Sequence, residues 1–341
     1  MNKNLDVIIQ VITPWHAIGA KAILLYFREK GFKVDGTILI QKHAEAGYMV
    51  SSEEFQEDDV NVIYTEFEMP PKNIFKRIKR ESDIKKACNE YLNKKTDFDT
   101  VIATPWHVNK NKILQYSNEG KNFFSIVFDE GLATYINNDT SPLLSYEEDL
   151  KKNGKLEYFT LFTKNGEGLD DNKEIQNLYA DAIKINAERR DELSTIDLEN
   201  SAVIDTQTFV NDGQISEQEE LRIIKLVVDE CSKKDIKVFL KPHPRDDKLD
   251  RFKELNVELL SYTDVPQEEM FAKSAPRAVV GFTTTSLVTA NKLFGIKSIS
   301  LSKLVGEEVG ADMRRDMENF GKYFGDGVTI VESEEELIQS I

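Results

Sequence analysis

Five short motifs with polar or reactive side chains each follow an apolar, β-branched run in this sequence. The runs occupy residues 7–12, 101–103, 124–128, 238–240 and 278–281. The motifs after them are Thr-Pro-Trp-His at 13–16 and at 104–107, Asp-Glu-Gly at 129–131, Lys-Pro-His-Pro-Arg at 241–245 and Thr-Thr-Thr-Ser at 283–286. In an open α/β sheet, ligands bind beyond the carboxyl ends of the strands. The pattern therefore predicts parallel sheets whose strand ends together form one site.

Short apolar runs alternate with helical stretches along the whole chain, which is typical of a parallel sheet with helices on both faces. A first set of strands is expected at 5–12, 37–40, 61–64, 100–103, 123–128 and 158–162, and a second at 201–205, 237–241, 257–260, 277–281, 297–301 and 328–331. Helices are expected at 17–30 and 217–233, the latter with a capping box of Ser216 and Glu219. We predict an α/β protein of two Rossmann-like domains that face each other across a cleft, residues 1–195 and 196–341.

The composition excludes several classes of protein. The net charge of −16 disfavours nucleic-acid binding, which depends on basic residues that neutralise phosphates. No run approaches the roughly 20 apolar residues that a membrane helix needs, and the first residues lack a signal-peptide core. Cys88 and Cys231 form neither a disulfide framework nor a zinc site, and we expect both to be free thiols. These features are typical of a cytoplasmic protein.

Asp129, Glu130 and Gly131 place adjacent carboxylates at a strand end, with a glycine that permits a tight turn. A carboxylate there can take the proton of a sugar hydroxyl as that hydroxyl attacks. The alternative is an acidic turn that caps the next helix.

The two prolines that flank His243, in a motif that begins with Lys241, fix the backbone on both sides of this histidine and keep it out of a regular helix. As an imidazolium, His243 could stabilise a phosphate leaving group or protonate it. The alternative is a loop histidine between structural prolines, of which Pro244 is one.

Thr284, Thr285 and Ser286 open an apolar helical segment, 287–294. Hydroxyls and free N–H groups at a helix N-terminus form an anion site that needs no metal. The alternative is an ordinary helix cap.

The repeated Thr-Pro-Trp-His motif allows two interpretations. Trp15 and Trp106 could stack on a sugar face, and His16 and His107 could contact a carboxylate, a phosphate or an acceptor hydroxyl. Alternatively, the tryptophans form walls of the cleft and the histidines cap helices. Isolated histidines without metal-ligand spacing are weak evidence for a metal site.

The order of three motifs resembles that of the bacterial lipooligosaccharide and capsule sialyltransferases, which are related to polysialyltransferases and have the GT-B fold. These are Asp-Glu-Gly-Leu-Ala-Thr-Tyr at 129–135, His-Pro at 243–244 and the Thr/Ser run at 283–286. The resemblance implies that Asp129 is the general base and that His243 interacts with the donor phosphate. It places the phosphate-binding hydroxyl pair among Thr284, Thr285 and Ser286, where this chain has threonines in place of the usual serines.

The resemblance implies an inverting transfer of sialic acid from a CMP-sugar donor to a glycan acceptor of a surface polysaccharide, without cofactor or metal. The Asp-Phe-Asp triplet at 97–99 precedes a strand, so it lies at the sheet edge away from the predicted site. Alternatives are a donor with another nonulosonic acid or a UDP-hexose, and an inactive sugar-nucleotide-binding protein of capsule assembly.

Residues 72–86 hold the densest basic cluster of the chain, with Ile74, Phe75 and Ile78 on one helical face. Such a segment can contact an anionic inner membrane leaflet. The alternative is an amphipathic helix that packs on the sheet and exposes its basic face to solvent.

Overall fold

The computed structural model describes residues 4–43, 50–56, 58–67, 99–105, 123–136, 150–165, 168–260 and 265–341, together with residues 75, 79, 82 and 148. The chain forms two compact units. The first domain comprises Met1–Thr163 and Asp171–Ala182, and the second comprises Lys164–Asp170 and Ile183–Ile341. The change of unit at Ala182 falls inside a helix, α6 (Lys173–Arg189), whereas the sequence placed the boundary at residue 195.

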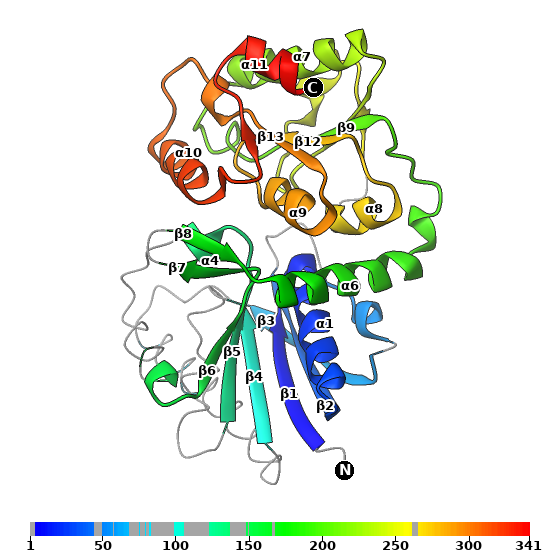
Figure 1. Cartoon of the computed structure of the whole chain (residues 1–341), viewed down its shortest axis with the longest axis vertical. Helices are drawn as coiled ribbons and strands as arrows, with labels where there is room; N and C mark the ends of the chain where they lie inside the picture. The colour runs from blue at the N-terminus through cyan, green and yellow to red at the C-terminus, as the bar shows by residue number, and fades with distance from the viewer. Residues whose placement is uncertain are drawn as a thin grey trace. The chain divides into compact units, whose positions relative to one another are not determined.

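The first domain contains a six-stranded sheet whose paired strands are all parallel, in the order β3-β2-β1-β4-β5-β6. Its strands are β1 (Asn4–Val11), β2 (Lys33–His43), β3 (Val60–Phe67), β4 (Asp99–Pro105), β5 (Phe123–Phe128) and β6 (Leu156–Phe159). Helix α1 (Pro14–Glu29) follows β1, and the short α4 (Ala133–Ile136) follows β5 (Figure 1). Two further strands, β7 (Phe162–Asn165) and β8 (Gly168–Asp171), pair with each other.

Close packing of α1 on the sheet depends on a glycine. A Cβ on Gly19 would lie 2.7 Å from the Phe128 ring and 2.7 Å from the Tyr179 hydroxyl. Since real Cβ atoms do not approach other atoms so closely, only glycine lets these rings meet the helix backbone. This contact places α1, the end of β5 and α6 around one point.

The second domain repeats the arrangement, with a sheet in the order β11-β10-β9-β12-β13-β14. Its strands are β9 (Ser201–Asp205), β10 (Lys237–Lys241), β11 (Glu258–Leu259), β12 (Ala278–Gly281), β13 (Lys297–Ser300) and β14 (Thr329–Ile330). Its helices are α7 (Glu217–Lys233), α8 (Gln267–Lys273), α9 (Thr285–Phe294), α10 (Ala311–Phe324) and α11 (Glu334–Ser340). Both sheets have the doubly wound order of a Rossmann fold. The prediction of two Rossmann-like domains is confirmed.

The N-terminus of helix α7 is capped partly by a local residue and partly by a residue distant in the sequence. Ser216 is its N-cap and accepts a hydrogen bond from Glu219 N, as expected. The second half of the predicted capping box is not formed, because Glu219 accepts instead from Gly306 N and pairs with Arg222. Glu307 takes its place and accepts from Ser216 N at 2.6 Å. The local pattern therefore located the helix start but not all of its partners.

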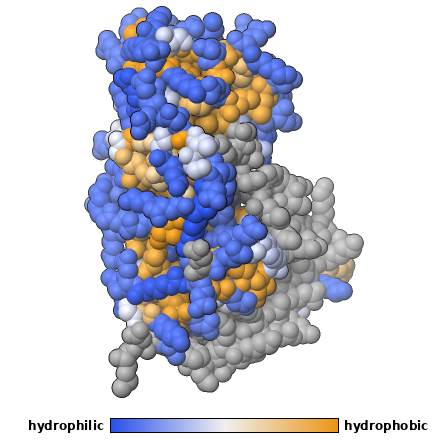
Figure 2. All heavy atoms as spheres, turned by 90° about the vertical axis from the view of Figure 1, so that its right-hand side faces the viewer, coloured by the Kyte–Doolittle hydropathy of each residue, from blue (hydrophilic) through white to orange (hydrophobic). Residues whose placement is uncertain are grey.

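The described surface carries hydrophilic residues interspersed with apolar ones on the face shown in Figure 2. Within the described ranges, no helix combines the length and the hydropathy needed to cross a bilayer. Cys231 is a free, buried thiol, and burial raises its pKa to about 11. Cys88 and most of the basic segment 72–86 lie outside the described residues.

Candidate active site

Asp129 lies directly after β5, at the carboxyl end of the first sheet, and is 1% exposed. Its Oδ2 accepts a hydrogen bond from the Tyr135 hydroxyl and another, of 2.7 Å, from Leu161 N. No hydrogen bond of normal geometry from the described residues reaches Oδ1. The carboxylate is thus held through Oδ2, while Oδ1 is buried without such a partner.

Burial raises the pKa of Asp129 to about 6, and the hydrogen bonds from Tyr135 and Leu161, with smaller effects of Gly131 and Thr134, offset this only in part. A carboxyl group with a pKa near 6 is largely ionised at neutral pH but is a stronger base than an exposed aspartate. The site therefore has the electrostatic properties of a general base.

The turn after Asp129 depends on Gly131, whose φ of 112° is a conformation that favours glycine. Glu130 is half-buried, and its N–H donates to Thr134 Oγ1 at 2.9 Å. The turn returns the chain so that Tyr135, in α4, reaches the carboxylate. The tight turn expected from the sequence is therefore what positions the hydrogen-bond donor of the candidate base.

His16 caps α1 rather than carrying a charge. The imidazole Nδ1 accepts hydrogen bonds from Ile12 N and Thr13 N, both at 3.3 Å. The backbone N–H of His16 donates to Thr13 Oγ1. Burial lowers the pKa of His16 to about 3, so the imidazole is neutral with its proton on Nε2. An ionic contact between His16 and a phosphate or carboxylate is therefore disfavoured.

Trp15 joins the start of α1 to the region of Asp129. Its ring lies 5.3 Å from that of Tyr179, and the charge of Asp129 contributes to raising the pKa of Tyr179, after burial. Trp15 Nε1, His16 Nε2 and the Tyr179 hydroxyl have no hydrogen-bond partner among the described residues. Tyr179 thus links Trp15 to the surroundings of the candidate base. Trp106 and His107, from the second copy of the motif, lie outside the described residues.

In the second domain, three neighbouring strands bring the other predicted residues to one sheet edge. Lys241, the last residue of β10, is in register with Asp205, the last residue of β9. On the other side of β9, β12 ends at Gly281 and leads into the threonine run. The motifs at 241–245 and 283–286 are therefore adjacent.

His243 is half-buried and has a defined tautomer. Its Nδ1 accepts a hydrogen bond of 3.1 Å from Arg245 N, so the neutral ring carries its proton on Nε2. Burial and the charge of Arg245 lower its pKa below the ordinary 6.5. Without a ligand, His243 is mainly neutral at physiological pH and offers an N–H donor. Pro244, next to it, is exposed.

A buried ion cluster supports the turn that carries His243. Arg251 forms two 2.8 Å hydrogen bonds with Asp246 and one of 2.6 Å with Glu220. Asp246 accepts from the Thr206 hydroxyl at 3.3 Å, and Thr206 Oγ1 accepts from His243 N at 3.1 Å. The histidine is thereby tied through Thr206 and Asp246 to a fixed guanidinium.

The threonine run begins α9. Thr284 is the N-cap residue, but its side chain makes no capping hydrogen bond. Its Oγ1 lies 3.0 Å from Ser286 Oγ, and Ser286 donates a hydrogen bond to Oδ2 of Asp205. Thr284 and Thr285 are half-buried, whereas Ser286 is buried. Thr284 therefore presents the outer hydroxyl of a connected pair next to the first N–H groups of the helix.

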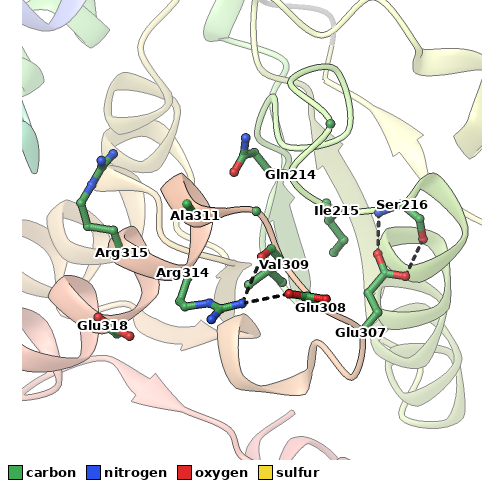
Figure 3. Close-up of a pocket in the computed structure, with 12 residues that line it drawn as sticks. Gln214, Ile215, Ser216, Glu307, Glu308, Val309, Ala311, Arg314, Arg315 and Glu318 are labelled. Carbon is green, nitrogen blue, oxygen red and sulfur yellow. Dashed lines mark hydrogen bonds and ion pairs between the residues drawn. The ribbon is translucent and has the colours of Figure 1, made fainter.

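A separate pocket of about 820 Å³ lies in the second domain and contains none of these residues (Figure 3). Residues 213–216 and charged side chains of the segment 307–318 line it. Glu307 holds the start of α7, and Arg314 lies 4.0 Å from Glu308 and donates to Val309 O at 3.4 Å. The charges of Glu307, Glu308 and Arg314 are thus already engaged by neighbouring groups of the protein.

Across the described ranges, no group of three or more His, Cys, Asp or Glu side chains is arranged to hold a metal ion. Asp99, from the Asp-Phe-Asp triplet, opens β4 opposite Leu5 of β1 and so lies at the amino end of that strand. Asp97 lies outside the described residues.

Sequence reasoning did not identify the residues that support the candidate residues within each domain, namely Tyr135 and Tyr179 in the first and Asp205, Thr206 and Arg251 in the second. Tyr135 belongs to the short helix that follows the Asp-Glu-Gly turn. A helix start at that place in the sequence could have indicated that Tyr135 returns to Asp129. Asp205 is the last residue of a correctly predicted strand, and its position alone could have marked it. No local sequence pattern indicates that Arg251 is buried and paired with two carboxylates.

Comparison with known proteins relates these sites to a family. The model of a family described as "Alpha-2,8-polysialyltransferase (POLYST)" matches residues 7–303 of the chain. No curated protein matches it by sequence.

Solved structures share the fold over nearly the whole chain. UDP-GlcNAc 2-epimerase from Methanocaldococcus jannaschii superposes with a TM-score of 0.57 at 12% identity, covering 99% of this chain and 91% of that one. An α/β-galactoside α-2,3-sialyltransferase from Photobacterium phosphoreum gives a TM-score of 0.52 at 13% identity, covering 97% of this chain and 99% of that one. At these identities the likeness shows the fold alone, which is the GT-B type.

Proposed function

This chain belongs to the alpha-2,8-polysialyltransferase family, and we propose that it is an inverting, metal-independent glycosyltransferase that moves sialic acid from CMP-sialic acid to a hydroxyl of a glycan acceptor. The observation that carries the proposal is the buried Asp129, held through Oδ2 and with a pKa of about 6. The family's description points to the 8-hydroxyl of an acceptor that ends in sialic acid.

Asp129 acts as the general base in this proposal. The acceptor hydroxyl gives its proton to Oδ1, and its oxygen forms a bond to the anomeric carbon of the donor sugar. The bond from that carbon to the phosphate oxygen breaks, and its electron pair leaves with CMP. A single displacement from the face opposite the leaving group inverts the configuration.

The second domain stabilises the departing phosphate in this proposal. The Nε2–H of His243, the Thr284 hydroxyl and the first N–H groups of α9 are donors at adjacent strand ends. Lys241 adds a positive charge at the same edge, since it lowers the pKa of Asp205 and Glu268. CMP-sialic acid has one phosphate, so these groups can supply the stabilisation that a divalent ion gives to a diphosphate.

Release of CMP from CMP-sialic acid, dependent on an added sialylated acceptor, tests the activity. Chromatography resolves the released nucleotide directly. A thermal-shift series with CMP, UDP and GDP identifies the nucleotide, since a ligand that binds the native state raises its apparent stability. Stabilisation by UDP but not CMP would favour a UDP-hexose donor, and CMP binding without turnover would favour an inactive binding protein.

We also propose peripheral contact with the inner membrane leaflet through the basic segment 72–86, most of which lies outside the described residues. This would bring the enzyme to lipid-linked acceptors on the cytoplasmic side. Sedimentation with anionic but not neutral liposomes, lost at high salt and in the triple variant Lys76→Glu, Arg77→Glu, Arg80→Glu, is expected. Equal sedimentation of the wild type and the variant would exclude it.

A further inference from the structure

A chain of hydrogen bonds runs from the buried end of β9 to the start of α9. Asp205 is 5% exposed, and its Oδ2 accepts hydrogen bonds from Ser286 Oγ and, at 3.0 Å, from Gln267 Nε2. Ser286 Oγ lies 3.0 Å from Thr284 Oγ1, and either hydroxyl can donate in this contact. The half-buried Thr284 hydroxyl is therefore connected through Ser286 to a carboxyl group that lies beneath the surface.

The direction of these hydrogen bonds depends on the charge of Asp205, because each hydroxyl has a single proton to donate. When Asp205 is ionised it only accepts, so Ser286 donates to it and Thr284 donates to Ser286. Thr284 then presents only lone pairs outward, which repel a phosphate oxygen. When Oδ2 carries a proton, Asp205 donates to Ser286 and Ser286 donates to Thr284. The Thr284 proton is then free for a phosphate.

We propose that protonation of Asp205 turns the Ser286–Thr284 hydroxyl pair toward the donor phosphate, which makes Asp205 a positioning residue for CMP-sugar binding. The inference rests on the proposed function, in which Thr284 contacts that phosphate. It predicts that the enzyme binds its donor best when Asp205, which takes no part in the reaction itself, is protonated.

The surroundings of Asp205 make both forms accessible near neutral pH. Burial, with a smaller contribution from Glu268, raises its pKa to about 7, although Ser286, Gln267 and Lys241 act in the opposite direction. These groups come from the three neighbouring elements β10, α8 and α9. Glu268 is itself buried and accepts a 2.6 Å hydrogen bond from Thr289, and burial raises its pKa. Oδ1 of Asp205 has no hydrogen-bond partner among the described residues, so no second strong donor favours the ionised form.

The test uses calorimetric binding of the methyl phosphodiester of CMP to the full-length protein. This probe keeps one negative charge throughout the pH range, whereas the CMP phosphate titrates near pH 6. A hydrogen bond to a charged group corresponds to a factor of about 10 to 100 in affinity. We expect affinity to fall by at least about tenfold from about pH 6 to about pH 8.5, as Asp205 loses its proton. Asp205→Asn should remove this dependence, because its amide donates to Ser286 at every pH.

A second variant guards against poor folding of Asp205→Asn, and two controls show whether His243 or an unrelated carboxylate causes the pH dependence. Ser286→Ala breaks the chain and should also remove the pH dependence, even if Asp205→Asn folds poorly. His243→Gln should bind more weakly but keep the wild-type dependence. Asp250→Asn, an exposed carboxylate paired with Lys253, should behave as wild type.

The outcomes separate this inference from the proposed function. If Thr284→Ala and His243→Gln both bind the phosphodiester as tightly as wild type, the phosphate site of the proposed function is wrong. If these variants bind weakly but Ser286→Ala retains the wild-type pH dependence, only the role of Asp205 is overturned. The same holds if the wild-type affinity does not change with pH.

Discussion

The Tyr135 hydroxyl donates a hydrogen bond to Oδ2 of Asp129, and the same hydroxyl accepts one of 3.2 Å from Phe162 N. Because Tyr135 has one proton, the N–H of Phe162 ensures that this proton goes to the carboxylate. One oxygen of the candidate base is thereby fixed, and the other is the one to which the proposed mechanism assigns the proton of the acceptor.

Replacing Asp129 by asparagine should lower kcat by roughly 10²–10⁴-fold, because the amide cannot accept the acceptor's proton. Affinity for CMP should stay near that of wild type, since the proposed donor site consists of residues of the second domain. Steady-state kinetics and CMP calorimetry measure the two effects. Glu130→Gln is the matched control, and a large loss in that variant with near-normal turnover of Asp129→Asn would reverse the assignment.

The rate should depend on the ionisation of Asp129. A base must be deprotonated, so kcat/KM should rise with pH through about 6, the pKa of the Asp129 carboxyl. Tyr135 lowers this pKa through its hydrogen bond, and Tyr135→Phe should therefore shift the acid limb to higher pH. A pH–rate profile with Tyr323→Phe as control checks the sign. A shift to lower pH would contradict the proposed role.

His243→Ala should weaken CMP binding by about 10- to 100-fold, the effect of one hydrogen bond to a charged group. Cytidine, which lacks the phosphate, should bind both proteins equally. Calorimetry with the two ligands makes the comparison. Equal losses for CMP and cytidine would show that His243 does not contact phosphate.

Removal of divalent ions should leave activity largely intact, because the proposed stabilisation of the leaving group comes from side chains and a helix N-terminus. The measurement is CMP release after dialysis against EDTA. Loss of activity that one particular divalent ion restores would refute the metal-independent mechanism.

Arg251→Ala should destabilise the second domain by about 3–5 kcal/mol, because it leaves two buried carboxylates unpaired. Arg222→Ala is the matched control. The Arg222 side chain is 42% exposed, against 1% for Arg251, although each contacts two carboxylates. An exposed pair contributes about 0–1 kcal/mol. Denaturant unfolding of both variants tests this difference, and similar losses would mean that burial does not govern the cluster.

The strands and the start of α7 followed from the sequence because their signals are local. The run at 201–205 and the run at 237–241 match β9 and β10, since a buried parallel strand needs an uninterrupted apolar stretch. Ser216 marked the start of α7 for a similar reason, because a cap acts within its own turn. Placement of Asp129 and His243 at strand ends required only the order of the elements.

The partners of these residues were decided by the tertiary structure. Asp205 and Ser286 are 81 positions apart, and Asp129 and Leu161 are 32 apart. No local pattern encodes such pairs, because the register of β9 against β12 and the path of the chain after β6 bring them together. Burial then sets their chemistry, since the pKa of Asp129 or Asp205 depends on how much water the surrounding fold removes. The sequence by itself determined which groups stand at the strand ends, and the packing determined which of them carry a proton.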